Sequence, residues 1–213
     1  PRRGEYRLVF ILIFLICMKT QLTNAFGCPD EGLLREFCSY DIQCPECCKL
    51  EPHKAIKENL TIDMDLGLCS MHWSRQYEYP WAMLNSSFTG EDLCLEAGGG
   101  YATFKYGLAK RCKQVVSIDT DLDSQRKAFD STARLGINNI LYANQSIQDF
   151  KYINKFDKIY CLSVIEHIED RAVRLKCLEN MLTLLKPDGE LFITFDVFLK
   201  HTNDQFYIDG AEA

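Results

Sequence analysis

The residues with the clearest chemical pattern are Glu96, Gly98, Gly99, Gly100 and Asp119. The three glycines follow a short apolar run, and glycine inside a regular element costs about 0.5 to 1 kcal/mol relative to alanine. They therefore predict a loop that needs special dihedrals or close approach to a ligand. A carboxylate roughly 20 residues after such a loop is placed to accept both hydroxyls of a ribose. The pattern predicts a nucleoside site, with a tight structural turn as the alternative.

Short apolar runs must position this loop and this carboxylate. From residue 92 onward they alternate with helical patterns, and the predicted strands are 93–95, 115–118, 139–143, 158–165 and 190–196. Strands that alternate with helices imply right-handed crossovers. The sequence therefore predicts an α/β fold, a doubly wound and mainly parallel Rossmann-like sheet with helices on both faces. Ligands of such sheets bind beyond the carboxyl ends of the strands.

Helical spacing fills the intervals between these strands. After the glycines it is carried by Tyr101, Phe104, Leu108 and Cys112. A helix over 121–135 is predicted to bury Leu122, Phe129 and Ala133, and a later one to bury Leu175, Leu178, Leu182 and Leu185. The later helix must end before Pro187, where 186–189 predicts a type I turn.

Four ordered stretches carry a resemblance to a known family. They are E-x-G-x-G at Glu96, Gly98 and Gly100, then VVSIDTD, FDKIYCLSVIEHIED and LLKPDGELFIT. Over about residues 91–198 the chain resembles the class I S-adenosylmethionine-dependent methyltransferases, especially their small-molecule, type 11/25-like branch. The resemblance implies S-adenosyl-L-methionine as cofactor, bound by Glu96, Ala97, Gly98, Gly100, Asp119, Thr120, Gln145, Ser146, Cys161 and Leu162.

The resemblance also implies roles for these residues. Asp119 binds the ribose, Gln145 and Ser146 border the adenine, and the backbone of Cys161 and Leu162 faces the amino acid end. Gln145 stands where the family frequently has aspartate. Its amide oxygen can still accept a hydrogen bond from the adenine amine.

The charge of Glu96 bears on the choice of cofactor. In NAD sites the corresponding loop faces a pyrophosphate at a helix N-terminus, and a carboxylate would repel that anion. Glu96 instead suits the amino group of a methionine, which it would hold directly or through a water. The residue therefore favours the methyl donor over NAD.

Glu166 and His167 follow the fourth predicted strand and are the candidate catalytic residues. An imidazole has the pKa to take a proton near neutrality, which an acceptor that enters in its protonated form would require. The alternative is equally weighted: His167 packs under the cofactor or caps the next helix.

An aromatic stretch before the first strand supplies candidate acceptor contacts. In the resembled family this region forms a lid over donor and acceptor, which implies Arg75, Tyr77 and Tyr79 as substrate contacts. Packing of a lead-in helix against the core is the favoured alternative.

Two short cysteine motifs raise the question of a metal. Cys44 and Cys47 form one C-x-x-ligand pair, and Cys69 and His72 form another, as in tetrahedral zinc sites. Their separation exceeds the common pattern and other cysteines offer rival partners. Ordinary thiols are therefore favoured, with structural zinc as the alternative, and no metal ligand is assigned.

Composition divides the chain into three regions. Residues 1–18 are interpreted as an apolar leader or a non-native extension, 19–90 as a Cys-rich cap or lid, and 91–213 as the S-adenosylmethionine-binding domain without its C-terminal strands. The apolar run at 8–18 is shorter than the about 20 residues that span a bilayer. A net charge of -6 argues against nucleic acid. A cytoplasmic location is expected, as is association through an exposed fifth strand.

The function that follows is S-adenosylmethionine-dependent methyl transfer to a small-molecule, sugar or lipid acceptor. One alternative is an NAD or nucleotide-sugar oxidoreductase, although no tyrosine-lysine pair at short spacing follows the fourth strand. The other is a non-catalytic partner subunit that keeps the cofactor fold.

Overall fold

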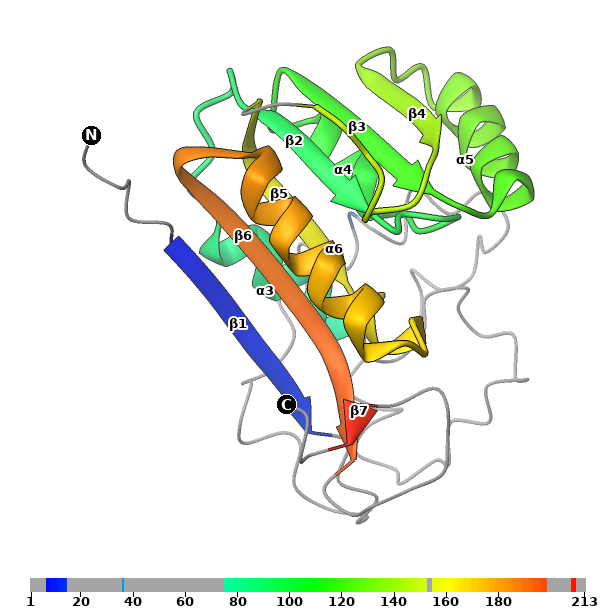
Figure 1. The fold of residues 1–213 in the computed structure, drawn as a ribbon. Coiled ribbons are helices and arrows are strands. Elements are labelled where there is room, and N and C mark those ends of the chain that lie inside the picture. The colour runs from blue at the N-terminus through cyan, green and yellow to red at the C-terminus, as the bar shows by residue number, and fades with distance from the viewer. Residues whose placement is uncertain (1–6, 15–35, 37–74, 153–154, 199–207, 210–213) are drawn as a thin grey trace, which may run out of the picture.

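One sheet organises the part of the chain that the computed structural model describes, residues 7–14, 36, 75–152, 155–198 and 208–209. Its strand order is β1-β6-β5-β2-β3-β4, with β7 paired to the end of β6 (Figure 1). All pairs are parallel, which confirms the predicted sheet. The strands are β1 (Arg7–Phe14), β2 (Leu93–Ala97), β3 (Gln114–Asp119), β4 (Ile140–Asn144), β5 (Phe156–Leu162), β6 (Leu185–Phe198) and β7 (Ile208–Asp209).

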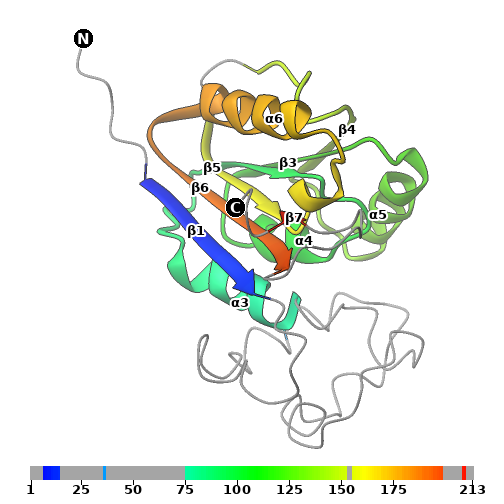
Figure 2. The ribbon, with the colours of Figure 1, turned by 60° about the horizontal axis from the view of Figure 1, so that its bottom comes forward.

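Helices cover both faces of this sheet. They are α3 (Arg75–Asn85), α4 (Phe104–Ala109), α5 (Leu122–Arg134) and α6 (Arg171–Leu184), with a short 3-10 turn, η3 (Ile165–His167). Figure 2 shows α6 on one face and α3 and α4 on the other. Helix α5 contacts α4, because Tyr106 Oη of α4 donates a hydrogen bond to Ala128 O of α5 at 3.1 Å. Among the described helices, none combines the length and the apolar character needed to cross a membrane.

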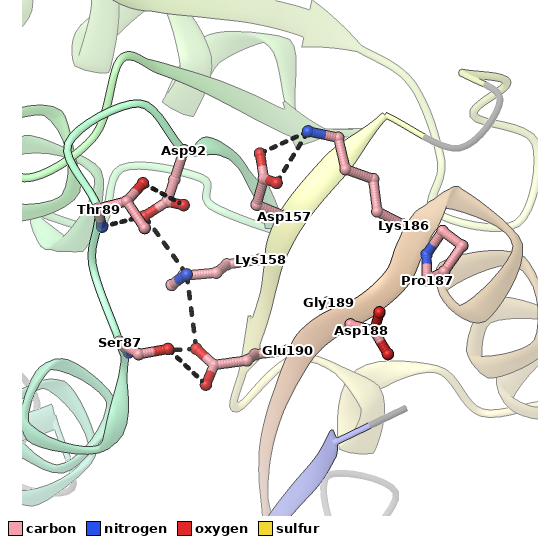
Figure 3. A pocket seen from close by; sticks show the side chains of 10 residues that line it. All are labelled: Ser87, Thr89, Asp92, Asp157, Lys158, Lys186, Pro187, Asp188, Gly189 and Glu190. Carbon is pink, nitrogen blue, oxygen red and sulfur yellow. Dashed lines mark hydrogen bonds and ion pairs between the residues drawn. The ribbon is translucent and has the colours of Figure 1, made fainter. Parts of the chain in front are cut away.

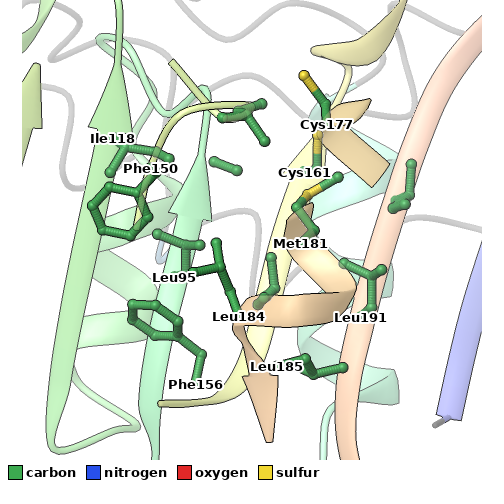
Figure 4. Packing of buried hydrophobic residues seen from close by; sticks show 14 of the residues in the cluster. Leu95, Ile118, Phe150, Phe156, Cys161, Cys177, Met181, Leu184, Leu185 and Leu191 are labelled. Carbon is green, nitrogen blue, oxygen red and sulfur yellow. The ribbon is translucent and has the colours of Figure 1, made fainter. Parts of the chain in front are cut away.

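Alternation along the strands produces two cores. Leu95 and Ala97 belong to the cluster under α6, whereas Cys94, which directly precedes Leu95, belongs to the cluster under α3 and α4. Side chains of a strand point alternately to opposite faces of the sheet, so each buried apolar strand contributes residues to both hydrophobic clusters. Figure 4 shows the first cluster, where side chains of α6 meet those of the strands: Cys177, Met181, Leu184, Leu95, Ile118, Cys161 and Leu191. Cys94 and Cys161 are buried free thiols.

The predicted inner face of α5 is wrong, and that of α6 is right only in part. In α5, Leu122, Phe129 and Ala133 are exposed, and the buried residues are Gln125, Ala128, Ser131 and Thr132. The polar side chains among them have hydrogen-bond partners inside the protein: Gln125 Nε2 donates to Ala143 O at 2.8 Å, and Thr132 Oγ1 donates to Ala128 O at 2.9 Å. In α6 the predicted Leu178 and Leu182 do pack, half-buried, against the core, but Leu175 is exposed and the fully buried residues are Cys177, Met181 and Leu184. Leu185 is buried as predicted but already belongs to β6.

Two boundaries around β6 also differ from prediction. Leu185 pairs with Phe156 and Glu190 with Lys158, so residues 186–189 bulge out of the strand. Asp188 has φ 65°, which a type I turn does not allow at its central positions, so the predicted turn type is wrong.

The edge of β6 is the second difference. The predicted unpaired edge is occupied by β1, in register from Arg7↔Glu190 to Phe14↔Val197. The apolar residues at the start of the run 8–18 satisfy backbone groups that would otherwise be open. The interpretation of residues 1–18 as a leader or extension stays a hypothesis.

Candidate active site

The site forms where the order of the sheet reverses. From β2 the chain proceeds to β3 and β4 on one side, while β5 returns to the other side of β2 and β6 follows it. Glu96 of β2 lies opposite both Ser117 and Tyr160. A switch point of this kind opens a crevice at the carboxyl ends of the two central strands. The glycine loop follows β2 and the turn η3 follows β5, so both flank this crevice.

The glycine loop is held against the end of β3. Gly98 N and Gly99 N both donate to Ile118 O, at 2.9 and 3.1 Å. Gly100 N donates to Asp119 Oδ2 at 2.7 Å. The structure thus brings together the loop and the carboxylate that the sequence pattern paired.

The three glycines have different reasons to be glycine. A Cβ on Gly98 would lie 2.3 Å from a methyl of Val164, and one on Gly99 would lie 2.0 Å from Glu96 Oε2. At Gly100 a Cβ would meet only Asp119 Oδ2, at 3.3 Å, within a 4 Å radius. Gly98 and Gly100 also have positive φ, 74° and 41°. The structural-turn interpretation therefore explains the first two glycines, whereas Gly100 has open space beside it.

Asp119 keeps acceptor capacity beside this loop. Its Oδ1 accepts Asp121 N at 2.8 Å while Oδ2 accepts Gly100 N. Each carboxylate oxygen can accept two hydrogen bonds, so each retains one site. Register with Asn144 places the predicted adenine border, Gln145 and Ser146, at the same edge of the sheet.

The remaining residues near this border differ in burial. Thr120 and Gln145 are exposed, whereas Ala97 is buried in the core. Ser146 Oγ donates to Asp149 Oδ2 at 2.8 Å. Thr120 and Gln145 are thus accessible to a ligand, and Ala97 can contribute only backbone.

Glu96 is buried and paired with a cation that sequence reasoning missed. Its Oε2 accepts Ser117 Oγ at 2.7 Å and lies 3.2 Å from Lys105 Nζ. Lys105 has no exposed surface. Burial lowers the pKa of Lys105 and the charge of Glu96 opposes this. The available signal was a lone lysine at an inward position of the helix that follows the glycines.

The other wall of the crevice begins at the end of β5. Cys161 and Leu162 are buried, and burial raises the pKa of the Cys161 thiol. Ser163 then adopts φ 47°, a strained value for a residue other than glycine. Its N–H donates to Thr194 O at 2.9 Å and to Thr194 Oγ1 at 3.0 Å. The strained turn leads directly into η3.

Helix α3 reaches this turn with two charged side chains. Glu78 is buried, accepts from Arg75 Nη1 through Oε2, and accepts Ser163 Oγ through Oε1 at 2.5 Å. Arg75 Nη2 also donates to Ser163 O at 3.4 Å. Burial opposes the charge of Arg75, but the carboxylate of Glu78 outweighs it and the pKa of Arg75 is raised. Glu78 and Ser163 were not predicted.

Glu166 and His167 stand beside Arg75. Glu166 is buried, and its charge contributes to the raised pKa of Arg75. His167 is exposed at residue level. Burial of its ring and the charge of Arg75 lower the pKa of His167 below 6.5, so its imidazole is neutral at pH 7. The charge of Arg75 thus acts on the predicted residue His167, and that of Glu166 acts on Arg75.

The other two predicted acceptor contacts have different outcomes. Tyr79 is buried and its ring packs 5.0 Å from that of Phe104, which is the core packing favoured as the alternative. The side chain of Tyr77 lies outside what the structure describes. Of the two whose side chains are described, Arg75 is placed at the crevice and Tyr79 is not.

Metal binding has no support in the described part of the chain. There, no three His, Cys, Asp or Glu side chains gather as metal ligands would. The candidates Cys44, Cys47, Cys69 and His72 lie outside the described residues.

A polar pocket of about 250 Å³ lies at the opposite, amino ends of the strands (Figure 3). Lys158 points between two carboxylates, with Nζ 3.3 Å from Asp92 Oδ2 and 3.6 Å from Glu190 Oε2. Ser87 Oγ donates to Glu190 Oε1 at 2.9 Å. The charges of Lys158, Asp92 and Glu190 are paired with one another. These three residues form a buried ion network that lines the pocket and joins the starts of β2, β5 and β6.

Comparison with known sequences points to one family. Residues 94–189 match the profile of a family described as "Methyltransferase domain". A ubiquinone biosynthesis O-methyltransferase of Actinobacillus pleuropneumoniae serotype 7 is 30% identical over 106 residues, which are 47% of this chain and 44% of that protein. The chain thus spans less than half the length of this curated relative.

Solved structures share the fold. NodS, an N-methyltransferase from Bradyrhizobium japonicum solved with S-adenosyl-L-homocysteine, is 25% identical with a TM-score of 0.53, covering 66% of this chain and 71% of NodS. The [4+2]-cyclase SpnF, at 17% identity and a TM-score of 0.54 over 62% of this chain and 49% of SpnF, shows the fold alone. Together, the profile, the relative and the fold support a class I S-adenosylmethionine-dependent methyltransferase domain over residues 94–189, as the motifs predicted.

Proposed function

We propose that this chain transfers the methyl group of S-adenosyl-L-methionine to a hydroxyl of a small-molecule acceptor. The observation that carries the proposal is the bond from Gly100 N to Asp119 Oδ2 at the switch point of the sheet. It fixes a carboxylate with one free acceptor site on each oxygen beside an open glycine. That arrangement fits a ribose with two vicinal hydroxyls.

The rest of the crevice supports the same assignment. The cofactor supplies a methyl carbon activated by a sulfonium, and the protein must hold an acceptor in line with it and exclude water. His167 accepts the proton of the acceptor hydroxyl, because its lowered pKa keeps the imidazole neutral at pH 7. Arg75 and Glu78 position the turn that carries His167, through their contacts with Ser163.

The choice of a hydroxyl acceptor rests on two points. The curated relative is named an O-methyltransferase, and a base is needed for a hydroxyl that must lose its proton. Sugars and lipid intermediates are acceptors of this class, and a cytoplasmic location remains a prediction.

Calorimetry tests the cofactor. We expect S-adenosyl-L-homocysteine to bind and NAD⁺ not to bind. Asp119→Asn keeps one acceptor oxygen and removes one charge-assisted bond of about 1.5–3 kcal/mol, so affinity should fall about 10- to 150-fold. Asp130→Asn, an exposed change on α5, is the matched control and should have no effect. Binding of NAD⁺ alone would favour the oxidoreductase, and equal loss in both variants would remove Asp119 from the site.

Turnover tests the acceptor. The protein is incubated with S-adenosyl-L-methionine and small phenols, alcohols or amines, and release of S-adenosyl-L-homocysteine is measured. Release with hydroxyl compounds is expected. If S-adenosyl-L-homocysteine is released with amines alone, the acceptor is an amine and the proposed hydroxyl is wrong. If the cofactor binds but no S-adenosyl-L-homocysteine is released, the non-catalytic partner subunit is favoured.

A further inference from the structure

Lys105 is a fully buried cation directly beneath the glycine loop. Its Nζ donates to Gly99 O at 3.0 Å and also to Ala102 O, and it lies 3.2 Å from Glu96 Oε2. An ammonium has three hydrogens, and these acceptors are enough to satisfy all of them. Because Lys105 has no exposed surface, its Nζ meets these protein oxygens in place of solvent.

This placement changes the charge that Glu96 offers to a ligand. A lone carboxylate at the head of the loop would attract the ammonium of a methionine. With Lys105 beside it the pair is neutral, and two opposite charges at this distance in a buried site cancel strongly. Ser117 Oγ further occupies the same oxygen, Oε2, while Oε1 keeps its acceptor capacity.

The backbone of the glycine loop is fitted closely around the pair of Glu96 and Lys105. A Cβ on Gly99 would lie 2.0 Å from Glu96 Oε2 and 2.5 Å from Ser117 Oγ, so only glycine lets the chain pass over this oxygen. Lys105 also reaches Gly100 O at 3.4 Å. The same lysine therefore shapes the loop and neutralises the carboxylate.

We propose that Lys105 is a specificity-determining residue that weakens recognition of the ligand's ammonium by neutralising Glu96. The inference rests on the proposed function, because the ammonium is that of the methionine part of the cofactor. From the sequence, Glu96 alone is the expected partner of that ammonium; here Lys105 reduces the charge that Glu96 offers to it. The neutral pair makes the site depend more on the nucleoside and less on the amino acid end.

The test compares two ligands that differ only in the ammonium. They are S-adenosyl-L-homocysteine and its des-amino analogue, and the measured quantity is the ratio of their dissociation constants, analogue over parent. Lys105→Met and Lys105→Gln should raise this ratio about tenfold, the size of one charge-assisted bond. Any distortion of the loop affects both ligands alike, so a merely structural lysine would leave the ratio unchanged.

Changes at Glu96 provide the second arm. Glu96→Gln leaves Lys105 without its partner near the ligand's ammonium, so the ratio should fall about tenfold below that of the wild-type protein. The double variant Glu96→Gln with Lys105→Met carries neither charge and should return the ratio to within about twofold of the wild-type value. This arm also decides the matter if the single Lys105 variants do not fold, as judged by circular dichroism.

The outcomes separate the two proposals. Wild-type protein that binds both ligands with a ratio unmoved by the Lys105 and Glu96 changes overturns this inference alone. A ratio that falls in Lys105→Met also overturns it. Wild-type protein that binds neither ligand overturns the proposed function, and this inference with it.

Discussion

Replacing Lys158 by methionine removes a buried cation from between two carboxylates. Its side chain is 5% exposed, and its Nζ lies 3.3 Å from Asp92 Oδ2 and 3.6 Å from Glu190 Oε2. Breaking a buried pair by removing one partner costs about 3–5 kcal/mol, because a buried charge is left uncompensated. Asp92 keeps its bonds from Thr89 and Glu190 keeps those from Ser87, so the lower end, about 3 kcal/mol, is expected.

Urea unfolding at pH 7 measures this cost, and the same pocket offers a control. Lys186 pairs with Asp157 at 2.8 Å, but its side chain is 42% exposed. Lys186→Met should therefore lower the free energy of unfolding by no more than about 1 kcal/mol. A loss of less than about 1 kcal/mol for Lys158→Met, or equal losses for the two variants, would refute the reasoning.

The cost should also depend on pH. Burial acts to raise the pKa of Asp92, but hydrogen bonds from Thr89 and then the charge of Lys158 outweigh it, so the pKa lies below its ordinary 3.8. A lowered pKa gives stability that is present above the unfolded value and lost as pH falls through the folded value. The gap between wild type and Lys158→Met should therefore narrow once the pH falls below about 4.

Three further changes probe the site and the core. His167→Gln should lower kcat at least about 100-fold and remove the acidic limb of the profile below pH 6.5, and an unchanged profile from pH 6 to 9 would exclude the base role. Gly98→Ala should lower the melting temperature, and it should weaken the affinity for S-adenosyl-L-homocysteine at least about tenfold. The reasons are the φ of 74° at Gly98 and the side chain of Val164, which lies 2.3 Å from the added Cβ. Gly90→Ala, at φ 83° with open space, should cost only about 1 kcal/mol and leave binding unchanged. Met181→Ala should cost about 2–5 kcal/mol in urea unfolding, whereas the exposed Leu175→Ala should stay within about 0.5 kcal/mol.

The strands were predictable because buried parallel strands are nearly continuous apolar runs. Strands β2 to β5 have their predicted cores, with ends shifted by one to a few residues. The inner faces of the helices were not predictable by hydrophobicity alone. In α5 a glutamine is buried because a carbonyl of β4 accepts its hydrogen bond, and such a partner is invisible in the sequence.

Some residues of the site were likewise predictable from the sequence and others were not. The glycine loop and Asp119 were predictable because their spacing follows from one strand, one helix and the next strand. Glu78 and Ser163 are 85 residues apart in sequence, and only the packing of α3 against the end of β5 brings them together. Lys105 was missed because a lysine in an amphipathic helix usually extends its ammonium to water. Here four oxygens in the protein replace that water.

The position of β2 in the sheet has a consequence for how the protein is made. It is the first strand of the methyltransferase region in the chain, yet it lies between β5 and β3. Parallel neighbours cannot close as hairpins, so each pairing waits for a whole crossover to be synthesised. On the ribosome, the wall with the glycine loop and Asp119 can form once β3 has emerged, whereas the wall with Ser163 and His167 must wait for β5. The two walls of the crevice therefore become able to form at different times during synthesis, the wall with Asp119 before the wall with Ser163.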